Sequence, residues 1–372
     1  MNNQVLNHFM KQKKSLTFLL VICFLTLFQS VKSQNLAAYV DYKNAFNVFH
    51  DGVKIQLDHR KAESYKVGYT FVAYINVQNE LWVYQNEKQT KIIDWVNNYT
   101  ITDNLMTFGD NGFLNVYENG NARLLCSQTG IYGMGDSIVA YHDIQNNSFE
   151  VYYNQKIIQL ETDLLNGIEN FKVGENLVAY INPQNYFLAF YHGEIIQLMY
   201  TDDPIKFDVG LNTIAYINPA IESFHVVYYG EEKELEEYPP LSFKCGDNMV
   251  AYVTMEGEFF QYYKGNKMKV NSFSPDLYTV TDKMLVYEML GRLYAFYEGQ
   301  SYELANFLPN NYQIDRGSVA FTDQQGKLWL FNGGEKTKVS IERVSSFELI
   351  GNTLSYDIGT NTSKVYFKGR TY

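Results

Sequence analysis

The stretch FKVGENLVAYINPQNYFLAFYHGEIIQL, residues 171–198, decides the fold of this 372-residue chain. It contains four short runs rich in β-branched and aromatic residues. The runs are separated by Gly-Glu-Asn, Asn-Pro-Gln-Asn and His-Gly-Glu, which are residues that favour turns. Runs of this length and composition between turn residues predict four consecutive antiparallel strands.

The same pattern occurs ten times along the chain. Each copy contains a triplet similar to Val-Ala-Tyr, and its aromatic residue recurs at intervals of 33 to 39 residues. These aromatic residues are Tyr39, Tyr74, Phe108, Tyr141, Tyr180, Tyr216, Tyr252, Tyr287, Phe321 and Tyr356. No segment of comparable length has an apolar period of 3.6 residues, so we expect few helices. The sequence therefore predicts an all-β repeat protein.

A turn residue after the third run of each copy supports this prediction. Short hairpins need a backbone position with positive φ, which glycine adopts most easily and asparagine next. Glycine occurs at 52, 120, 193, 230, 265, 299, 333 and 369, and the two other copies have Asn86 and Asn154. All ten copies thus satisfy one stereochemical requirement of a hairpin.

Four strands in about 35 residues, repeated ten times, resemble the blades of β-propeller proteins. The tyrosine-rich copies are most similar to TolB-like or surface-layer-type periplasmic propellers, and this resemblance implies binding more than catalysis. We predict one propeller domain at residues 34–372, built as one ring of ten blades; two five-bladed rings are the alternative. The first copy starts at its second strand, and the terminal pieces could complete each other's sheet, although a full first strand is missing at one end and a full fourth strand at the other. Large aromatic side chains such as Trp82 and Tyr84 are expected to fill the space between blades.

The first 33 residues differ from the repeats. Lysines lead into the apolar run Leu16–Phe28, which is too short to span a bilayer comfortably, and Val31 and Ser33 suit a signal-peptidase site. We predict a signal peptide at residues 1–33 and export to the periplasm. Its removal changes the formal net charge from −11 to −15, because it carries four lysines and no acidic residue.

This acidic charge bears on the partner. Nucleic-acid binding depends on lysine and arginine replacing counterions on phosphates, so we expect no nucleic-acid partner. No segment after residue 33 is apolar enough over a sufficient length to cross a membrane, so we expect no direct membrane insertion. Cys126 and Cys245 lie four repeats apart, and we expect two buried free thiols because a disulfide requires Cα atoms within about 7 Å.

No catalytic signature is visible in the chain. The five histidines after residue 33 are dispersed without metal-ligand spacing, and no Gly-x-Ser-x-Gly elbow is present. Asp136, Glu175 and Asp247 lie in predicted turns between first and second strands, where ordinary turn chemistry explains them. A ring of such acids could alternatively bind a cation or a sugar. The sequence therefore predicts no catalytic, cofactor-binding or metal-binding residue and no cofactor.

Two classes of function fit these observations. The first is a non-enzymatic periplasmic protein-interaction propeller with an envelope or outer-membrane partner, such as a soluble accessory subunit of a protein-secretion translocon. The acidic run Glu231–Glu237, on a predicted outer strand, is either a solvated edge or a docking site for a basic partner. The second class is a carbohydrate- or calcium-binding enzyme or lectin, in which acids from several blades would converge.

Overall fold

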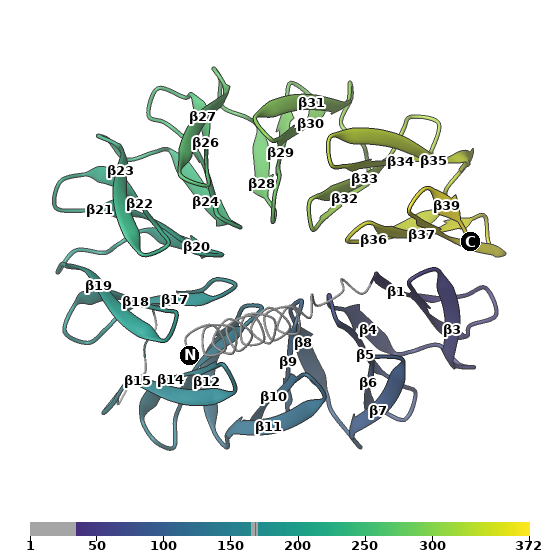
Figure 1. The fold of residues 1–372 in the computed structure, drawn as a ribbon, viewed down its shortest axis with the longest axis horizontal. Helices are drawn as coiled ribbons and strands as arrows, with labels where there is room; N and C mark the ends of the chain where they lie inside the picture. Colours follow the sequence, from purple (N-terminus) through teal and green to yellow (C-terminus); the bar gives the residue numbers. More distant parts are fainter. Residues whose placement is uncertain (1–34, 165–167, 169) are drawn as a thin grey trace, which may run out of the picture. The chain divides into compact units, whose positions relative to one another are not determined.

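The computed structural model describes residues 35–164, 168 and 170–372, and Asn35–Tyr372 form one compact unit. The predicted signal peptide lies outside the described residues. Strands, turns and irregular connections make up the described part of the chain, and it contains no helix. Ten antiparallel sheets follow one another around one ring (Figure 1). The all-β prediction and the single ring are confirmed, and the alternative of two five-bladed rings is wrong.

We number the sheets as blades 1 to 10 in chain order and the strands within each blade from the centre of the ring outward. The first strands are β4 (Ser64–Val67), β8 (Asn98–Ile101), β12 (Thr129–Met134), β16 (Phe171–Val173), β20 (Phe207–Gly210), β24 (Ser242–Gly246), β28 (Leu277–Val280), β32 (Tyr312–Asp315) and β36 (Ser346–Ile350). The second strands carry the repeated triplet and are β1 (Leu36–Val40), β5 (Phe71–Ile75), β9 (Leu105–Gly109), β13 (Ile138–Asp143), β17 (Leu177–Ile181), β21 (Thr213–Asn218), β25 (Met249–Val253), β29 (Leu285–Met289), β33 (Ser318–Thr322) and β37 (Thr353–Ile358).

The third and fourth strands form the outer half of each blade. The third strands are β2 (Phe46–His50), β6 (Leu81–Gln85), β10 (Leu114–Glu118), β14 (Ser148–Tyr153), β18 (Tyr186–Tyr191), β22 (Ser223–Tyr228), β26 (Phe259–Tyr263), β30 (Arg292–Tyr297), β34 (Lys327–Asn332) and β38 (Thr362–Phe367). The fourth strands are β3 (Val53–Asp58), β7 (Lys88–Ile93), β11 (Asn121–Cys126), β15 (Lys156–Glu161), β19 (Glu194–Tyr200), β23 (Glu231–Glu236), β27 (Asn266–Asn271), β31 (Gln300–Ala305), β35 (Glu335–Arg343) and β39 (Arg370–Thr371). Within the described residues blade 1 has three strands, β1 to β3, and every other blade has four.

The core lies between neighbouring blades. The ten triplet aromatics are all buried, with at most 8% of their surface exposed. Phe187 on the third strand of blade 5 shows the repeated contact: its ring lies 4.9 Å from Phe207 and 5.4 Å from Tyr216, the first- and second-strand aromatics of blade 6. The same three-ring contact recurs around Phe46, Phe149, Phe224 and Phe259. As predicted, aromatic side chains fill the space between blades; Tyr84 is buried and Trp82 is half-buried.

The hairpins between third and fourth strands contain two consecutive residues with positive φ. Gly52, for example, has a φ of 94° and the preceding Asp51 a φ of 47°. All ten positions predicted from the sequence have positive φ. Asn86 and Asn154, however, occupy the first of the two positions, so Glu87 and Gln155 stand where most other blades have glycine, each with a φ of 60°.

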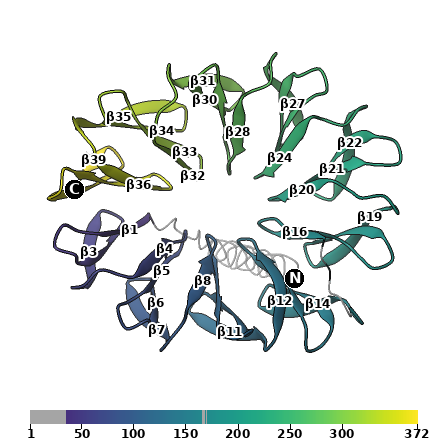
Figure 2. The same cartoon turned by 180° about the vertical axis from the view of Figure 1, so that it is seen from behind.

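The ring closes by side-chain packing, and the expectation that the chain ends share one sheet is wrong. β39 folds back after Gly369 and pairs with β38, so the C-terminal strand belongs to blade 10 alone. Blade 1 packs against blade 10 through a buried cluster that includes Tyr39, Phe49, Val365 and Phe367. β1 contacts β37, and the violet β1 lies beside the yellow strands of blade 10 in both views of the ring (Figure 1, Figure 2).

The two ends of the strands define two faces. The turns between strands 1 and 2 and between strands 3 and 4 form one face, which we call the turn face. The loops between strands 2 and 3 and the connections from one blade to the next form the other, which we call the loop face. Backbone hydrogen bonds join its two kinds of segment, for example from Thr129 N–H to Gly112 O at 2.7 Å and from Val344 N–H to Gly326 O at 2.9 Å.

Cys126 and Cys245, the two cysteines after residue 33, are free thiols, as predicted. Cys126 is buried. Cys245 is half-buried as a residue, but its thiol is removed from solvent, and this burial raises the pKa of the thiol well above its usual value. Within the described residues no helix has the length and hydrophobicity needed to cross a membrane.

Candidate functional site

The three acids singled out in the sequence come together on the turn face. Asp136, Glu175 and Asp247 lie in the turns that join the first to the second strands of blades 4, 5 and 7. Each carboxylate is close enough to raise the pKa of another: Glu175 is influenced by both Asp136 and Asp247. Asp103 and Asp282, in the corresponding turns of blades 3 and 8, belong to the same group. We call these five residues the acidic cluster.

Part of the acidic cluster is joined by hydrogen bonds between neighbouring blades. The N–H of Asp103 donates to the Asp136 carboxylate at 2.7 Å, and the N–H of Asp136 donates to the Glu175 carboxylate at 3.1 Å. We call the turns that join first to second strands the inner turns. The backbone of one inner turn is thus held by the side chain of the next. Such bonds explain Asp136 and Glu175 as structural acceptors, in agreement with the turn chemistry expected from the sequence.

The electrostatics of the cluster are dominated by burial. Loss of solvation, with the neighbouring carboxylates second, raises the pKa of Glu175 to about 8, of Asp247 to about 7 and of Asp282 to about 6. The same cause raises the pKa of Asp136. Among the described residues no group of three histidine, cysteine, aspartate or glutamate side chains is placed to hold a metal ion.

One arginine compensates part of this negative charge. Arg316, in the inner turn of blade 9, donates from Nε to the Asp103 carboxylate of blade 3 at 2.9 Å. Its guanidinium also lies 5.5 Å from the ring centroid of Tyr69 in blade 2. The side chain therefore ties the inner turns of blades 2 and 3 to blade 9, across the ring closure.

Close packing of the inner turns explains their glycines. A Cβ atom on Gly135 would lie 1.9 Å from Gly174 O, and one on Gly174 would lie 2.4 Å from Gly210 O. A Cβ atom on Gly210 would likewise lie 2.2 Å from Gly246 O. The inner turns of blades 4 to 7 consequently touch backbone to backbone, which leaves no room for a side chain.

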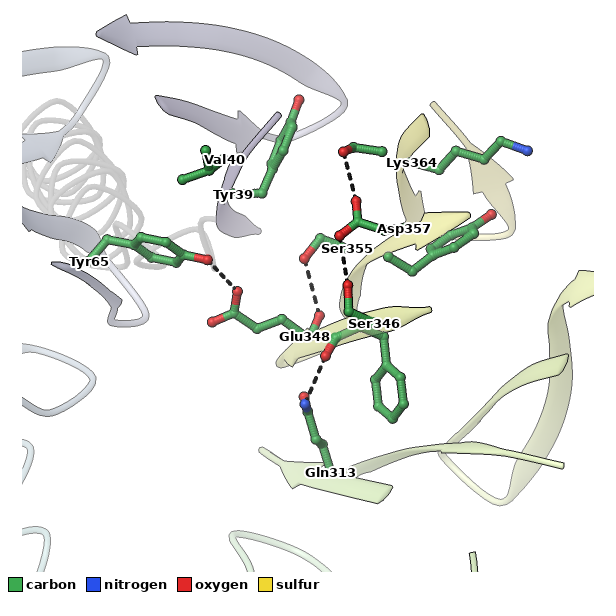
Figure 3. Close-up of a pocket in the computed structure, with 12 residues that line it drawn as sticks. Tyr39, Val40, Tyr65, Gln313, Ser346, Glu348, Ser355, Asp357 and Lys364 are labelled. Atoms are coloured by element: carbon green, nitrogen blue, oxygen red, sulfur yellow. Dashed lines mark hydrogen bonds between the residues drawn. The ribbon is translucent and has the colours of Figure 1, made fainter. Parts of the chain in front are cut away.

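A second candidate site is the pocket at the ring closure. It has a volume of about 450 Å³ and lies between blade 10 and blades 1 and 2 (Figure 3). Two carboxylates line it. Glu348 accepts a hydrogen bond from Tyr65 at 2.8 Å, and Asp357 accepts hydrogen bonds from Ser346 and Ser363, both at 2.7 Å. We call this the closure pocket.

The third feature is the distribution of exposed apolar side chains. Eleven large apolar side chains that are exposed lie in loops or connections of the loop face: Tyr42, Trp95, Phe113, Ile144, Ile221, Tyr238, Leu241, Met255, Phe273, Leu290 and Leu308. In the described turns of the turn face, Tyr229 is the one counterpart. The most exposed are Leu290, at 87%, and Phe273, at 74%.

A loop of blade 3 and the acidic run of blade 6 complete the description of the candidate sites. In the loop between β9 and β10, a hydrogen bond from Phe113 N–H to Asp110 O at 3.0 Å closes a turn. Glu231–Glu236 form β23, the outer strand of blade 6. Beside it on the loop face is a pocket of about 350 Å³, lined by Glu234, Leu235, Glu236, Glu237, Tyr238, Thr254, Met255 and Glu256.

Sequence reasoning missed Asp103, Asp282 and Arg316, and also Asp315 of blade 9, whose carboxylate accepts a hydrogen bond from Gly351 N–H of blade 10. A signal for three of them was present, because every member of the acidic cluster stands five residues before its triplet aromatic, and so does Arg316. Extending that spacing from Asp136 to all copies would have found them. The bond between Arg316 and Asp103 has no such signal, since it joins residues 213 positions apart.

These features define a β-propeller whose inner turns are tied together and whose loop face exposes apolar side chains. The model of the 10-bladed beta propeller domain matches residues 30–372, and the chain belongs to this family. The prediction of a β-propeller repeat protein is confirmed.

Three solved structures are similar to this chain at low sequence identity. BamB from Moraxella catarrhalis is 12% identical, with 72% of this chain and 95% of that chain covered and a TM-score of 0.33. The computationally designed protein Ika8 is 14% identical, with 73% and 96% covered and a TM-score of 0.37. Yeast RCC1 (Prp20), solved bound to Kap60, is 10% identical, with 54% and 70% covered and a TM-score of 0.32. Among curated protein sequences none matches this chain.

Proposed function

We propose that this protein is a non-enzymatic interaction module that binds a protein of the bacterial envelope through its loop face. The observation that carries the proposal is the asymmetry between the faces: eleven exposed large apolar side chains on the loop face against Tyr229 in the described turns opposite. Large apolar groups that stay in water on one face of a soluble domain mark a surface that another protein covers. The propeller fold itself is consistent with such a role.

The apolar side chains are most exposed on blades 6 to 8. Ile221, Leu241, Met255, Phe273 and Leu290 are each at least 55% exposed and come from five successive loops and connections. The chain brings two of these segments into direct contact, because Leu290 N–H, next to the exposed side chain, donates to Asp276 in the preceding connection at 3.0 Å. We call these five residues the loop-face patch. Aromatic and methionine side chains are typical of protein interfaces.

Two sequence features support the place of action that we propose. The predicted signal peptide supports export, and the acidic charge disfavours nucleic acid and anionic lipid as partners. Within the periplasm, an accessory subunit of an outer-membrane complex, such as a protein-secretion translocon, is the role that we propose. It requires no catalytic residue and no cofactor.

Affinity purification tests this function. Chain 34–372 is tagged and used to capture proteins from detergent-solubilised envelopes. A double variant, Phe273→Ser with Leu290→Ser, removes the two most exposed side chains of the loop-face patch. Tyr229→Ser removes an exposed aromatic from the turn face and is the matched control. We expect one stoichiometric partner with the wild-type chain and with the control, and at least about a tenfold loss with the double variant. Equal recovery by all three, or no partner at all, would refute the proposal.

A carbohydrate- or calcium-binding function is the second candidate. The observation that favours it is the convergence of carboxylates from five blades in the acidic cluster, which is the arrangement expected for this class. Calorimetric titration with calcium and a glycan array test it. Binding that is lost in Asp247→Asn and retained in the loop-face double variant would favour this second function.

A further inference from the structure

The inner edge of β1 differs from the corresponding edge in every other blade. In blades 2 to 10 the second strand pairs with a first strand on its central side, as β5 does with β4 through Tyr65 and Tyr74. In blade 1, β1 pairs outward with β2, and no described strand pairs with its central edge. The closure pocket lies along this edge and is lined there by Tyr39 and Val40.

A repeated contact shows what the adjoining blade presents to this edge. The first-strand residue that pairs with the residue just before the triplet aromatic reaches the first strand of the next blade: Lys66 donates to Tyr99 O at 2.6 Å and Lys244 to Tyr278 O at 2.8 Å. The side-chain amide of Gln313 makes two such bonds: its Nε2 donates to Phe347 O at 2.8 Å, and its Oε1 accepts from Leu349 N–H at 2.7 Å.

Glu348 holds the corresponding position in blade 10. Its carboxylate points into the closure pocket, where it accepts a hydrogen bond from Tyr65 of blade 2 (Figure 3). By analogy with Gln313, it is placed to accept a backbone N–H from a strand beside β1. Asp208 in blade 6 gives the precedent for a carboxylate, because it accepts Cys245 N–H at 2.8 Å.

The wall of the pocket indicates which side chain such a strand would carry. In nine blades one third-strand position holds a buried phenylalanine or leucine that faces the next blade: Phe46, Leu81, Leu114, Phe149, Phe187, Phe224, Phe259, Leu293 and Leu328. In blade 10 this position is Ser363, and its hydroxyl bonds to Asp357. An apolar wall is thus replaced by a hydroxyl and a carboxylate.

Among the described residues, no lysine or arginine forms an ion pair with the two carboxylates of the closure pocket. Neither Glu348 nor Asp357 forms an ion pair with a described residue, and Lys364, which lines the pocket, pairs with Glu342 at 3.3 Å and points away from both (Figure 3). Tyr39 and Tyr356 add aromatic rings to the lining. Two carboxylates beside aromatic rings favour a lysine or arginine side chain.

We propose that the inner edge of β1 accepts one extended segment of a partner protein, which adds a strand to blade 1 and places a lysine or arginine in the closure pocket. Main-chain hydrogen bonds to an open strand edge supply affinity in this mode of recognition, and the side-chain pocket supplies specificity. The inference deepens the proposed function by naming a partner chemistry. It uses a different site from the loop-face patch.

The test uses chain 34–372 and two capped heptapeptides, Ser-Thr-Arg-Val-Thr-Val-Ser and its twin with glutamate in place of arginine. Calorimetry measures affinity, and hydrogen exchange followed by mass spectrometry measures protection of residues 36–40. We expect the arginine peptide to bind and to slow exchange in β1, and the glutamate peptide to bind at least about tenfold more weakly.

Three variants locate the binding. Asp357→Asn, which keeps the shape of the side chain, is expected to weaken the arginine peptide about tenfold, and Ser363→Phe to block it by restoring the wall of the other blades. Glu303→Gln, an exposed carboxylate of blade 8 bonded to Arg292, is the control and should change nothing. Thermal melting verifies that each variant is folded, and Asp357→Asn remains informative if Ser363→Phe is not.

Three results would overturn the proposal. One is equal affinity for both peptides, and another is an unchanged exchange rate in β1 at saturating peptide. The third is protection of β1 without peptide in a chain that begins at residue 29, since its own residues would then fill the edge. If the envelope partner is still captured equally by wild type and Asp357→Asn, the proposed function stands and the strand-addition site alone fails.

Discussion

At the scale of single residues, the hairpin turns show how far sequence spacing can be trusted. Counting from the triplet aromatic located ten turn positions with positive φ, and all ten are confirmed. The count assigned Asn86 and Asn154 to the glycine position, whereas they stand one residue earlier. The reason is that these turns use two left-handed residues, and asparagine tolerates that conformation as well as glycine does in the first of them.

Glu87 should therefore be a strained position. It has a φ of 60° where most blades have glycine, and an L side chain in this conformation costs about 1 kcal/mol. We expect Glu87→Gly to stabilise the protein by about 0.5–1 kcal/mol, with the entropy of the unfolded chain offsetting part of the gain. Urea unfolding of the variant and the wild type measures the difference.

The control for this prediction is Glu335→Gly, because Glu335 is exposed on a strand and lacks a left-handed backbone. It should destabilise the protein slightly, since glycine weakens a strand. A Glu87→Gly variant that is less stable than the wild type would contradict the account of the turn.

At the scale of elements, the inner turns combine packing with charge. Spacing alone placed Asp136, Glu175 and Asp247 in turns between first and second strands, and the structure confirms this. What the sequence could not provide is the distance between turns of different blades, since it depends on the closure of the ring. The link from Arg316 to Asp103, across the closure from blade 9 to blade 3, is the clearest example.

The raised pKa values of the acidic cluster make stability depend on pH. Unfolded aspartate and glutamate release their protons near pH 4, while burial and neighbouring acids raise the folded pKa of Asp282, Asp247 and Glu175 to about 6, 7 and 8. Between these values the folded state binds more protons than the unfolded state. Stability from these groups is thus fully present below about pH 4 and is lost as the pH rises through about 6 to 8.

We expect the melting temperature of chain 34–372 to fall from about pH 5 to about pH 9, and the fall to be smaller in Glu175→Gln and Asp247→Asn. Calorimetric scans across this range measure both. Glu256→Gln, outside the cluster on the loop face, serves as the control and should follow the wild-type curve. Cluster variants that follow it too would show that these carboxylates do not set the dependence.

At the scale of the whole molecule, the sequence predicted the all-β class, the ten blades and the single ring. The prediction succeeded because every copy repeats one hydrophobic pattern and one turn requirement. It failed at the junction of the ends, where the two-residue β39 pairs within blade 10 and blade 1 closes the ring through Phe49, Phe367 and neighbouring apolar groups. A repeat pattern contains no information on which sheet a terminal strand joins, because either pairing satisfies the same backbone groups.

The asymmetry between the two faces could not be predicted either. Apolar residues in loops carry no period, and their exposure depends on which neighbouring loops cover them. Phe273 and Leu290 are ordinary connection and loop residues in the sequence, yet they are the two most exposed of the eleven large apolar side chains on the loop face. Only the assembled ring shows that such residues gather on the loop face, and this asymmetry is what supports an interaction function.

Site-specific photo-crosslinking tests this central claim most directly. A photoreactive amino acid replaces Phe273, Leu290 or, on the turn face, Tyr229 in the full chain expressed in cells, and crosslinked products are identified by mass spectrometry after irradiation. We predict that positions 273 and 290 yield the same envelope protein and that position 229 does not. The absence of any crosslink at 273 and 290, or the same product from position 229, would contradict a docking surface on the loop face.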